Sequence, residues 1–194
     1  FSSKTIPVLA ILRKNSFDNK NTQINYIGEL PDSFDAELLK RIYGYKFELK
    51  KVENASAISA FDGSTVFISQ QDKISTIDLN PNIDFFINVH SSLGSILLVN
   101  GEQNESYISE IQHVRRRESI AMTPSDCLVA LKSLIEQSSF DTEKSNVETN
   151  KTLVLDSIKG VTGTTTKPLV GSSGLSIQYA IMMGLIHDAV EEHK

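Results

Sequence analysis

The chain has 194 residues, of which 40% are hydrophobic and 22% charged, and its formal net charge is −5. This is an ordinary globular composition, and a chain of this length can bury a core without disulfides or metals. The acidic balance attracts neither nucleic acid nor an anionic membrane surface, so both are disfavoured as partners. The chain has no run of about 18 apolar residues, and we therefore expect no membrane span.

Cys127 is the only cysteine. It can form neither an intramolecular disulfide nor a cysteine cage for a metal, so we expect an intracellular protein. A cytoplasmic location is expected, with the mitochondrial matrix as the alternative, because Phe-Ser-Ser-Lys is compatible with the end left by a removed presequence. The four histidines show no metal-ligand spacing, and we expect neither a metal nor a cofactor.

Short apolar runs predict strands near the start of the chain. Residues 5–12 form one such run and residues 22–27 a second, and the two are expected to pair as a hairpin. A helix is predicted over residues 33–44, where Pro31-Asp32-Ser33 precedes apolar residues that share one helical face. A further strand is predicted over residues 46–52.

The region from residue 64 to residue 99 is rich in β-branched and aromatic residues. The breaks between its apolar runs are too short to hold a crossover helix, so an antiparallel meander is expected. The expected strands contain residues 66–68, 74–79, 85–89 and 96–99.

The clearest helix start in the chain is Thr123-Pro124-Ser125-Asp126, which combines a capping hydroxyl, a proline at the first helical position and an acid. It predicts a helix over residues 124–137 that turns Leu128, Leu131 and Leu134 inward. Residues 152–155 predict one more strand, and residues 175–192 a final helix that is apolar on more than one face.

Together these patterns predict a single α/β domain over residues 1–194, of the α+β type, with a mixed or largely antiparallel central sheet. Its helices are expected at about residues 33–44, 124–137 and 175–192. A mobile loop is expected at about residues 138–151, and a Gly/Thr/Ser-rich loop at residues 160–174.

The loop at residues 160–174 is the strongest functional candidate. Its backbone N–H groups, together with the positive end of the helix that follows, can hold an anion. The spacing does not match a phosphate-binding P-loop, because three threonines separate Gly163 from Lys167. A flexible or partner-binding loop and a plain turn are the alternatives. The expected anion-binding residues are Gly163, Thr165, Lys167, Ser172 and Ser173.

Two further features suggest a surface for another protein. Residues 115–117 form the one basic cluster, which would face an acidic partner or a phosphate, the alternative being a solvated surface run. In the last helix, flexible thioether side chains would adapt to an irregular partner surface. The expected partner-binding residues are Arg115, Arg116, Arg117, Met182 and Met183.

No catalytic constellation is recognised in the sequence. Asp84, His90 and Ser92 have the residue types of a nucleophile triad, but the chain contains no G-x-S-x-G elbow. Cys127 borders an apolar stripe, which predicts a packed thiol rather than a nucleophile. The catalytic residues are unknown, and whether the chain is an enzyme stays open.

The expected function is therefore that of a non-catalytic protein-binding or assembly domain, adaptor-like or chaperone-like, within a larger complex. Its expected partners are other protein subunits or a second copy of the chain. The alternative is a small enzyme that acts on a phosphorylated or carboxylated metabolite bound at residues 160–174.

Overall fold

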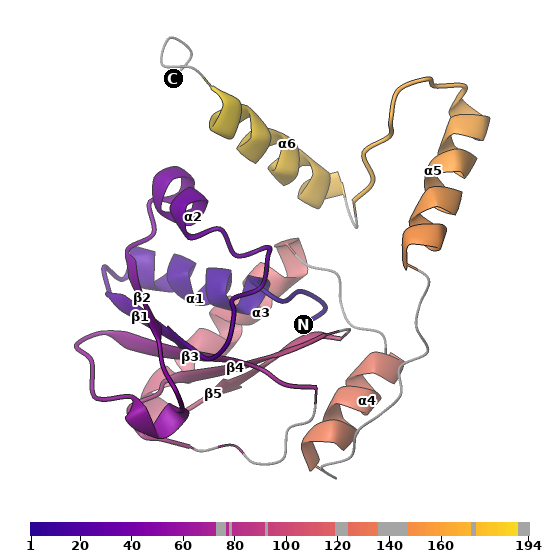
Figure 1. Cartoon of the computed structure of the whole chain (residues 1–194). Coiled ribbons are helices and arrows are strands. Elements are labelled where there is room, and N and C mark those ends of the chain that lie inside the picture. Colours follow the sequence, from indigo (N-terminus) through magenta and orange to yellow (C-terminus); the bar gives the residue numbers. More distant parts are fainter. Residues whose placement is uncertain are drawn as a thin grey trace. The chain divides into compact units, whose positions relative to one another are not determined.

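The computed structural model describes residues 1–72, 77, 79–91, 93–118, 124–135, 147–171 and 174–189. The chain divides into two compact units, Phe1–Phe140 and Asp141–Lys194. The first unit contains a β-sheet with its helices, and the described part of the second contains two helices (Figure 1). That the whole chain folds as one domain stays a prediction.

A five-stranded mixed sheet, with strand order β2-β1-β3-β4-β5, forms the centre of the first unit. Strands β2, β1, β3 and β4 run parallel to one another, and β5 is antiparallel to β4. The predicted α/β class with a mixed sheet is confirmed, whereas the antiparallel meander is wrong. The strands are β1 (Thr22–Tyr26), β2 (Phe47–Lys51), β3 (Ser64–Gln70), β4 (Phe85–His90) and β5 (Gly94–Val99).

The connection from β3 to β4 explains why the meander prediction fails. Residues 74–79 were expected to form a strand, but their described members, Ile77 and Leu79, are not in a strand. Ile77 instead packs against the apolar cluster on one face of the sheet. Residues 71–84, which connect β3 to β4, are enough for the crossover that parallel neighbours require.

Residues 5–12 are not a strand but lie mostly in helix α1 (Ile6–Phe17), so the predicted hairpin is also wrong. The Ser3 hydroxyl accepts hydrogen bonds from the N–H groups of Thr5 and Ile6 where the helix begins. Pro7 lies in the first helical turn, where a missing N–H has no cost. A short run of buried apolar residues fits a helix packed on a sheet as well as it fits a strand.

Helix α2 (Ala36–Tyr43) confirms the helix predicted over residues 33–44 but starts later than expected. Its N-cap is Asp35, whose Oδ1 accepts a hydrogen bond from the N–H of Leu38 at 2.9 Å. The helix ends at Gly44, which has the left-handed conformation with φ of 68°. The residues before Asp35 therefore belong to the loop that follows β1.

The two faces of the sheet are covered differently. Helices α1, α2 and α3 (Ser106–Glu118) pack on one face, whereas the other face is covered by irregular chain and the short 3₁₀ helix η1 (Ala55–Ala57). A second 3₁₀ helix, η2 (Glu102–Asn104), precedes α3. The helix-covered face buries Val8, Ile11, Leu12, Ile24, Leu39, Val66, Ile68, Phe85, Ile87, Tyr107 and Ile111, and the opposite face buries Ile58, Phe67, Ile83 and Phe86.

A buried polar network joins α1 to the sheet and to α3. Asn15 Nδ2 donates to Thr22 Oγ1 at 2.8 Å, and the Tyr107 hydroxyl donates to Asn15 Oδ1. The Ser64 hydroxyl donates to the same oxygen at 3.4 Å. Because these groups are removed from water, their mutual hydrogen bonds fix how the helices sit on the strands.

Helix α4 (Pro124–Ile135) confirms the helix predicted over residues 124–137, as far as it is described. The predicted burial of its leucines is wrong: Leu128 and Leu131 are each 54% exposed. Thr123 and the side chain of Leu134 lie outside the described residues. The amphipathic pattern thus marks a helix without indicating what covers its apolar stripe.

The second unit contains α5 (Val147–Thr162) and α6 (Gly174–Asp188). The strand predicted at residues 152–155 is wrong, since these residues lie in α5. Residues 147–151 and 160–162, which were expected to belong to loops, lie in the same helix. In this helix the Thr152 and Ser157 hydroxyls bond to carbonyl groups four residues earlier. Residues 136–146 and 190–194 lie outside the described part.

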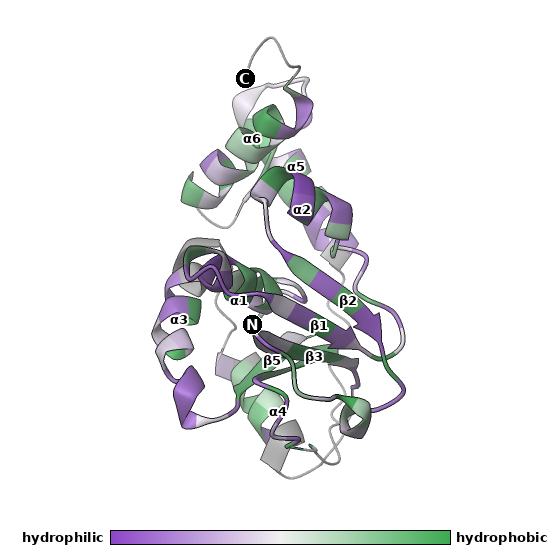
Figure 2. Cartoon of the chain, turned by 90° about the vertical axis from the view of Figure 1, so that its left-hand side faces the viewer, coloured by the Kyte–Doolittle hydropathy of each residue, from purple (hydrophilic) through white to green (hydrophobic). Residues whose placement is uncertain are grey.

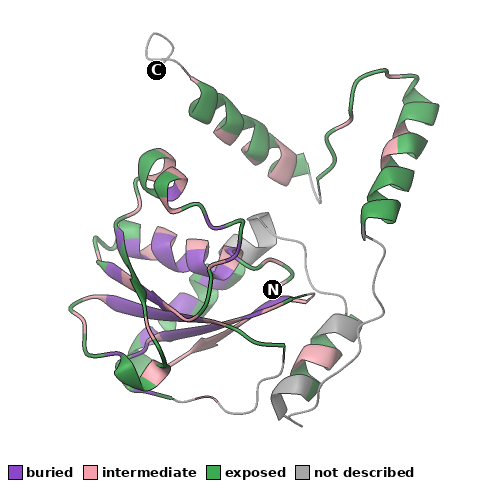
Figure 3. Cartoon of the chain, in the orientation of Figure 1, coloured by how far each residue is buried: buried purple, intermediate pink, exposed green. Residues whose placement is uncertain are grey.

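Neither helix of the second unit has a buried residue among those described (Figure 3). Helix α6 confirms the predicted final helix over residues 175–188, and it is apolar over much of its length (Figure 2).

Candidate functional site

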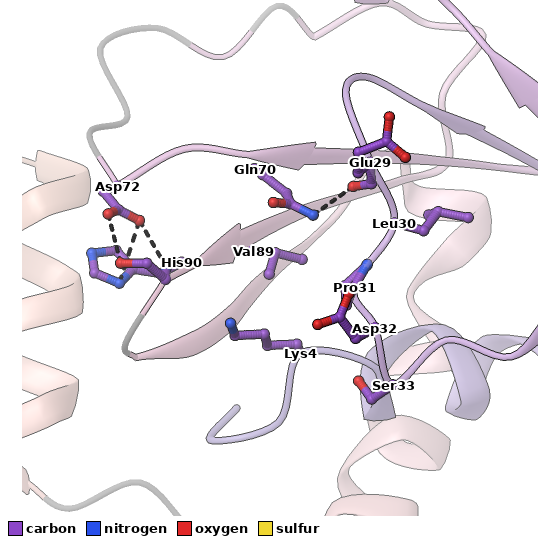
Figure 4. A pocket seen from close by; sticks show the side chains of 11 residues that line it. Lys4, Glu29, Leu30, Pro31, Asp32, Ser33, Gln70, Asp72, Val89 and His90 are labelled. Atoms are coloured by element: carbon purple, nitrogen blue, oxygen red, sulfur yellow. Dashed lines mark hydrogen bonds and ion pairs between the residues drawn. The ribbon is translucent and has the colours of Figure 1, made fainter. Parts of the chain in front are cut away.

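A pocket of about 700 Å³ opens at the carboxyl ends of β1, β3 and β4. In the sheet, β1 lies between β2 and β3. The loop after β1 leads to β2 on one side, whereas the loop after β3 leads to β4 on the other side, so the two loops diverge here. Such a switch point at the carboxyl ends of parallel strands is the usual ligand position in open α/β sheets. The pocket is lined by Lys4, Glu29, Leu30, Pro31, Asp32, Ser33, Gln70, Asp72, Val89, His90 and Ser91 (Figure 4).

One wall of the pocket is the loop between β1 and α2, which contains Glu29–Ser33. The side-chain amide of Gln70, at the end of β3, donates to the backbone carbonyl of Glu29 (Figure 4). Within the loop, the N–H of Phe34 donates to the Pro31 carbonyl at 2.7 Å. The first bond therefore joins the loop to β3, and the second closes a turn within the loop just before α2.

The opposite wall is built around Asp72, which follows β3. Its Oδ1 accepts the backbone N–H of Ser91 at 2.7 Å, and its Oδ2 accepts the Ser91 hydroxyl at 2.6 Å. Asp72 Oδ1 is also 3.7 Å from His90 Nδ1, which accepts the N–H of Leu93 at 3.2 Å. These contacts hold the segments that follow β3 and β4 together.

The electrostatic environment keeps Asp72 ionised. The hydroxyl and N–H of Ser91 lower the pKa of Asp72, and the charge of Lys4 acts in the same direction. Partial burial raises the pKa of Asp72, but this effect is smaller than the lowering by the hydrogen bonds from Ser91. Asp72 therefore presents a fixed negative charge at neutral pH.

The pocket carries more negative than positive groups. Glu29, Asp32 and Asp72 contribute carboxylates, whereas Lys4 contributes an ammonium and His90 an imidazole. Glu29 also pairs with Lys51, whose Nζ lies 3.1 Å from its carboxylate. In Figure 4, Lys4 lies between Asp32 on one side and Asp72 with His90 on the other.

The geometry does not assemble a nucleophile triad. Asp84 lies before the amino end of β4, where it accepts hydrogen bonds from Thr65 and Asn104, whereas His90 ends the same strand. The length of β4 separates them, which is about 20 Å at the rise of an extended chain. Ser91 cannot replace Ser92 in such a triad, because its hydroxyl donates to Asp72 rather than to a histidine. Ser92 lies outside the described residues.

The predicted anion-binding residues are only partly described. Gly163 has a left-handed φ of 68°, and its N–H bonds to the Lys159 carbonyl at the end of α5. Thr165 and Lys167 are exposed in the segment that follows, while Ser172 and Ser173 lie outside the described residues. Anion binding at this loop stays a prediction.

The predicted partner-binding residues lie on two different helices. Met182 is exposed and Met183 half-buried on α6. Arg115, Arg116 and Arg117 lie in the last turns of α3, and their side chains are outside the described part.

The pocket could not be recognised in the sequence, because its residues come together only when the strands run parallel. Charged or polar residues follow each of the three strands: Glu29 after β1, Asp72 after β3 and Ser91 after β4. In a parallel sheet these positions lie together at the carboxyl ends of the strands. In the expected meander they would alternate between the two ends of the sheet. The polar residues after each strand are visible in the sequence, but they indicate a common site only when the strands are known to be parallel.

Comparison with known proteins gives no family for this chain: no family model matches it, and neither a curated protein nor a solved structure does. The described residues contain no group of three or more His, Cys, Asp or Glu side chains arranged to hold a metal. None of the helices in the described ranges is both long and apolar enough to cross a membrane.

Proposed function

We propose that the first unit is a ligand-binding α/β domain whose pocket takes a small organic molecule with an amino or guanidinium group. The observation that carries this proposal is the excess of carboxylates over cations in a pocket at the switch point of the sheet. A pocket of about 700 Å³ falls in the size range of small-molecule sites.

The carboxylates would have different roles in binding. Asp72 is already held by Ser91, so it supplies a fixed negative potential without reorganising when the ligand enters. Asp32 is exposed in the β1–α2 loop and is placed to pair directly with the cationic group. Lys4 would then meet a carbonyl or carboxylate elsewhere on the same ligand. The preferred ligand is thus a cation that also carries an acceptor oxygen, as amino acids and their amides do.

The test is calorimetric titration of the full chain with arginine, lysine amide and, as the opposite charge type, succinate. We expect the two cationic compounds to bind and succinate not to bind. Asp32→Asn should weaken binding about tenfold, which corresponds to about 1.4 kcal/mol for one lost ion pair. The matched control is Asp62→Asn, which removes an exposed carboxylate that does not line this pocket.

Two results would contradict the proposal. One is succinate binding as tightly as the cations, which would mean that Lys4 rather than the carboxylates dominates the pocket. The other is an equal loss of affinity in Asp32→Asn and Asp62→Asn, which would place the ligand elsewhere.

A second candidate function is the binding of another protein through the second unit. The exposed fractions of Leu175, Met182 and Leu185 on α6 are 53%, 48% and 69%. Apolar side chains at this spacing form a stripe along one side of a helix, which supports a role as a docking surface. The basic residues 115–117 of α3 remain a proposed second contact for an acidic partner.

This candidate is tested with a photo-crosslinking residue at position 182 and, as the control, at Lys151, an exposed polar position on α5. A distinct crosslinked product from position 182 alone supports a partner surface on α6. No product at position 182, or the same products at both positions, contradicts it.

A further inference from the structure

Residues 1–4, which precede α1, are fastened to the edge strand β5. The N–H of Ser95 donates to the Phe1 carbonyl at 2.9 Å, and the Phe1 nitrogen donates to the Ser95 carbonyl at 2.8 Å. The hydroxyl of Ser95, a buried residue, donates to the Ser3 carbonyl at 2.6 Å. Residues 1–4 therefore form a strap whose path beside β5 is fixed by hydrogen bonds, and we call this segment the N-terminal strap.

Gly94 allows the N-terminal strap to approach the strand closely. It has a left-handed φ of 91°, and a Cβ atom at this position would collide with the Phe1 carbonyl oxygen and lie 2.6 Å from the carbonyl carbon of Ser2. Any larger residue would therefore displace the strap. Gly94 pairs with His90, which lines the pocket, so the strap passes β5 close to the pocket.

The other end of the N-terminal strap is fixed at the start of α1. The Ser3 hydroxyl accepts the N–H groups of Thr5 and Ile6 at 3.2 and 3.1 Å. Lys4 thus lies between two attachment points, one on β5 and one on the first turn of α1. Its backbone is held beside the pocket, while its long side chain can still adjust to a ligand.

Lys4 has the only ammonium or guanidinium group among the described residues that line the pocket. In Figure 4 its side chain extends toward the wall that contains Asp72 and His90. After the hydrogen bonds from Ser91, its charge also helps to lower the pKa of Asp72. Within the described part of the chain, no residue forms a salt bridge or a hydrogen bond with Lys4 Nζ. The ammonium is therefore available to a ligand.

We propose that Lys4 binds a free carboxylate and that Gly94 and Ser95 position it for this contact, so that the pocket takes an amino acid rather than a plain amine. A plain amine would leave its own cation and the Lys4 ammonium unpaired with each other in one pocket, and such like charges disfavour binding. A carboxylate on the ligand pairs with Lys4 while the cationic group pairs with Asp32.

This inference rests on the proposed function, because it assumes a ligand with a cationic group. Gly94 and Ser95 do not line the pocket, so they act on the ligand only through the N-terminal strap. They are positioning residues, and Lys4 is the residue that touches the ligand.

The test is calorimetric titration of the full chain with arginine and with agmatine, which is arginine without its carboxylate. The readout is the ratio of the two affinities. Lys4→Met should lower the preference for arginine about tenfold, because one ion pair is lost with arginine and none with agmatine. Lys4→Arg keeps the charge and should retain most of the preference. The matched control is Lys50→Met, which removes an exposed ammonium on β2 and should leave the ratio unchanged.

The positioning residues are tested with the same ratio. Ser95→Ala and Gly94→Ala should lower the preference for arginine in the folded chain, whereas a general loss of structure would weaken both compounds alike. In the Lys4→Met background, Ser95→Ala should have no further effect on the ratio, because the two residues act as one unit. The matched control is Ser69→Ala, which removes a strand hydroxyl that donates to Asn88 Oδ1 at 3.0 Å, away from the N-terminal strap. If Gly94→Ala does not fold, Ser95→Ala decides alone.

The outcomes separate this inference from the proposed function. If the native chain binds neither compound, the proposed function fails and this inference fails with it. If the native chain binds both and Lys4→Met leaves the ratio unchanged, only this inference is overturned. If Lys4→Met lowers the ratio but the folded Ser95→Ala and Gly94→Ala chains keep the native value, the N-terminal strap does not position Lys4, which also overturns the proposal.

Discussion

The carboxylate of Asp72 accepts two hydrogen bonds from Ser91, one from the backbone N–H at 2.7 Å and one from the hydroxyl at 2.6 Å. These bonds join the chain that follows β3 to the chain that follows β4, just beyond the last residues of the two strands. Both residues line the pocket. The contact therefore shapes one wall of the candidate site and lowers the pKa of Asp72.

This pKa shift predicts a pH-dependent effect of Asp72→Asn. The folded state lowers the pKa of Asp72, so the stabilisation is complete above the ordinary aspartate pKa, near 3.9, and is lost as the pH falls through the lowered value. Urea melts should show the native chain more stable than Asp72→Asn at pH 7, with the difference shrinking below pH 4. The side chain is 59% exposed, so the effect should be small.

The control for this measurement is Asp62→Asn, which removes an exposed carboxylate that does not line the pocket. A difference between the native chain and Asp72→Asn that stays constant from pH 7 to pH 2 would mean that the carboxylate charge is not the cause.

The buried network around Asn15 predicts that Tyr107→Phe lowers the free energy of unfolding by about 1 kcal/mol, the usual net value of one buried hydrogen bond. The substitution removes the hydroxyl and keeps the ring that packs against Phe85. Tyr43→Phe removes the same atom from a half-buried tyrosine and should change the stability little. Equal losses in the two variants, measured by urea unfolding, would argue against a special role for the network.

Burial predicts opposite outcomes for two apolar truncations. Ile11→Ala on α1 removes a side chain with no exposed surface and should cost about 2 to 5 kcal/mol. Leu131→Ala on α4 removes a side chain that is 54% exposed and should change the stability by less than about 0.5 kcal/mol. If Leu131→Ala costs as much as Ile11→Ala in the same denaturant melts, the apolar stripe of α4 is covered in solution.

The sequence predicted elements best where several local signals agreed. Helix α2 combines apolar residues on one face with a capping aspartate and a glycine stop, and α4 has a proline at its first position. Residues 5–12 and 152–155 were wrongly predicted as strands, because short apolar runs with β-branched residues satisfy both periodicities. For residues 5–12, packing of α1 against the sheet and α3 decides the outcome, and that packing involves residues far away in the sequence.

The pocket could not be predicted for the same physical reason. The pocket combines residues far apart in the sequence, among them Glu29, Asp72 and His90. Only the parallel direction of β1, β3 and β4 brings them together at the carboxyl ends of the strands. The run at residues 74–79 resembled a strand, which made the connection from β3 to β4 look too short for a crossover. The expected direction of β4 relative to β3 was therefore wrong, and the site could not be recognised.

Two aspartates of the β1–α2 loop allow effects on stability and on ligand binding to be measured separately. Asp35 caps α2 by accepting the N–H of Leu38, so Asp35→Ala should lower the free energy of unfolding by about 1 kcal/mol. Asp32, three residues earlier, is exposed and lines the pocket, so Asp32→Ala should leave the stability nearly unchanged and weaken the binding of a cationic ligand. Urea melts and calorimetric titrations of both variants separate the two roles. If Asp32→Ala destabilises the fold as much as Asp35→Ala does, the helix begins where the sequence first indicated, and the carboxylate of Asp32 would serve the fold instead of the pocket.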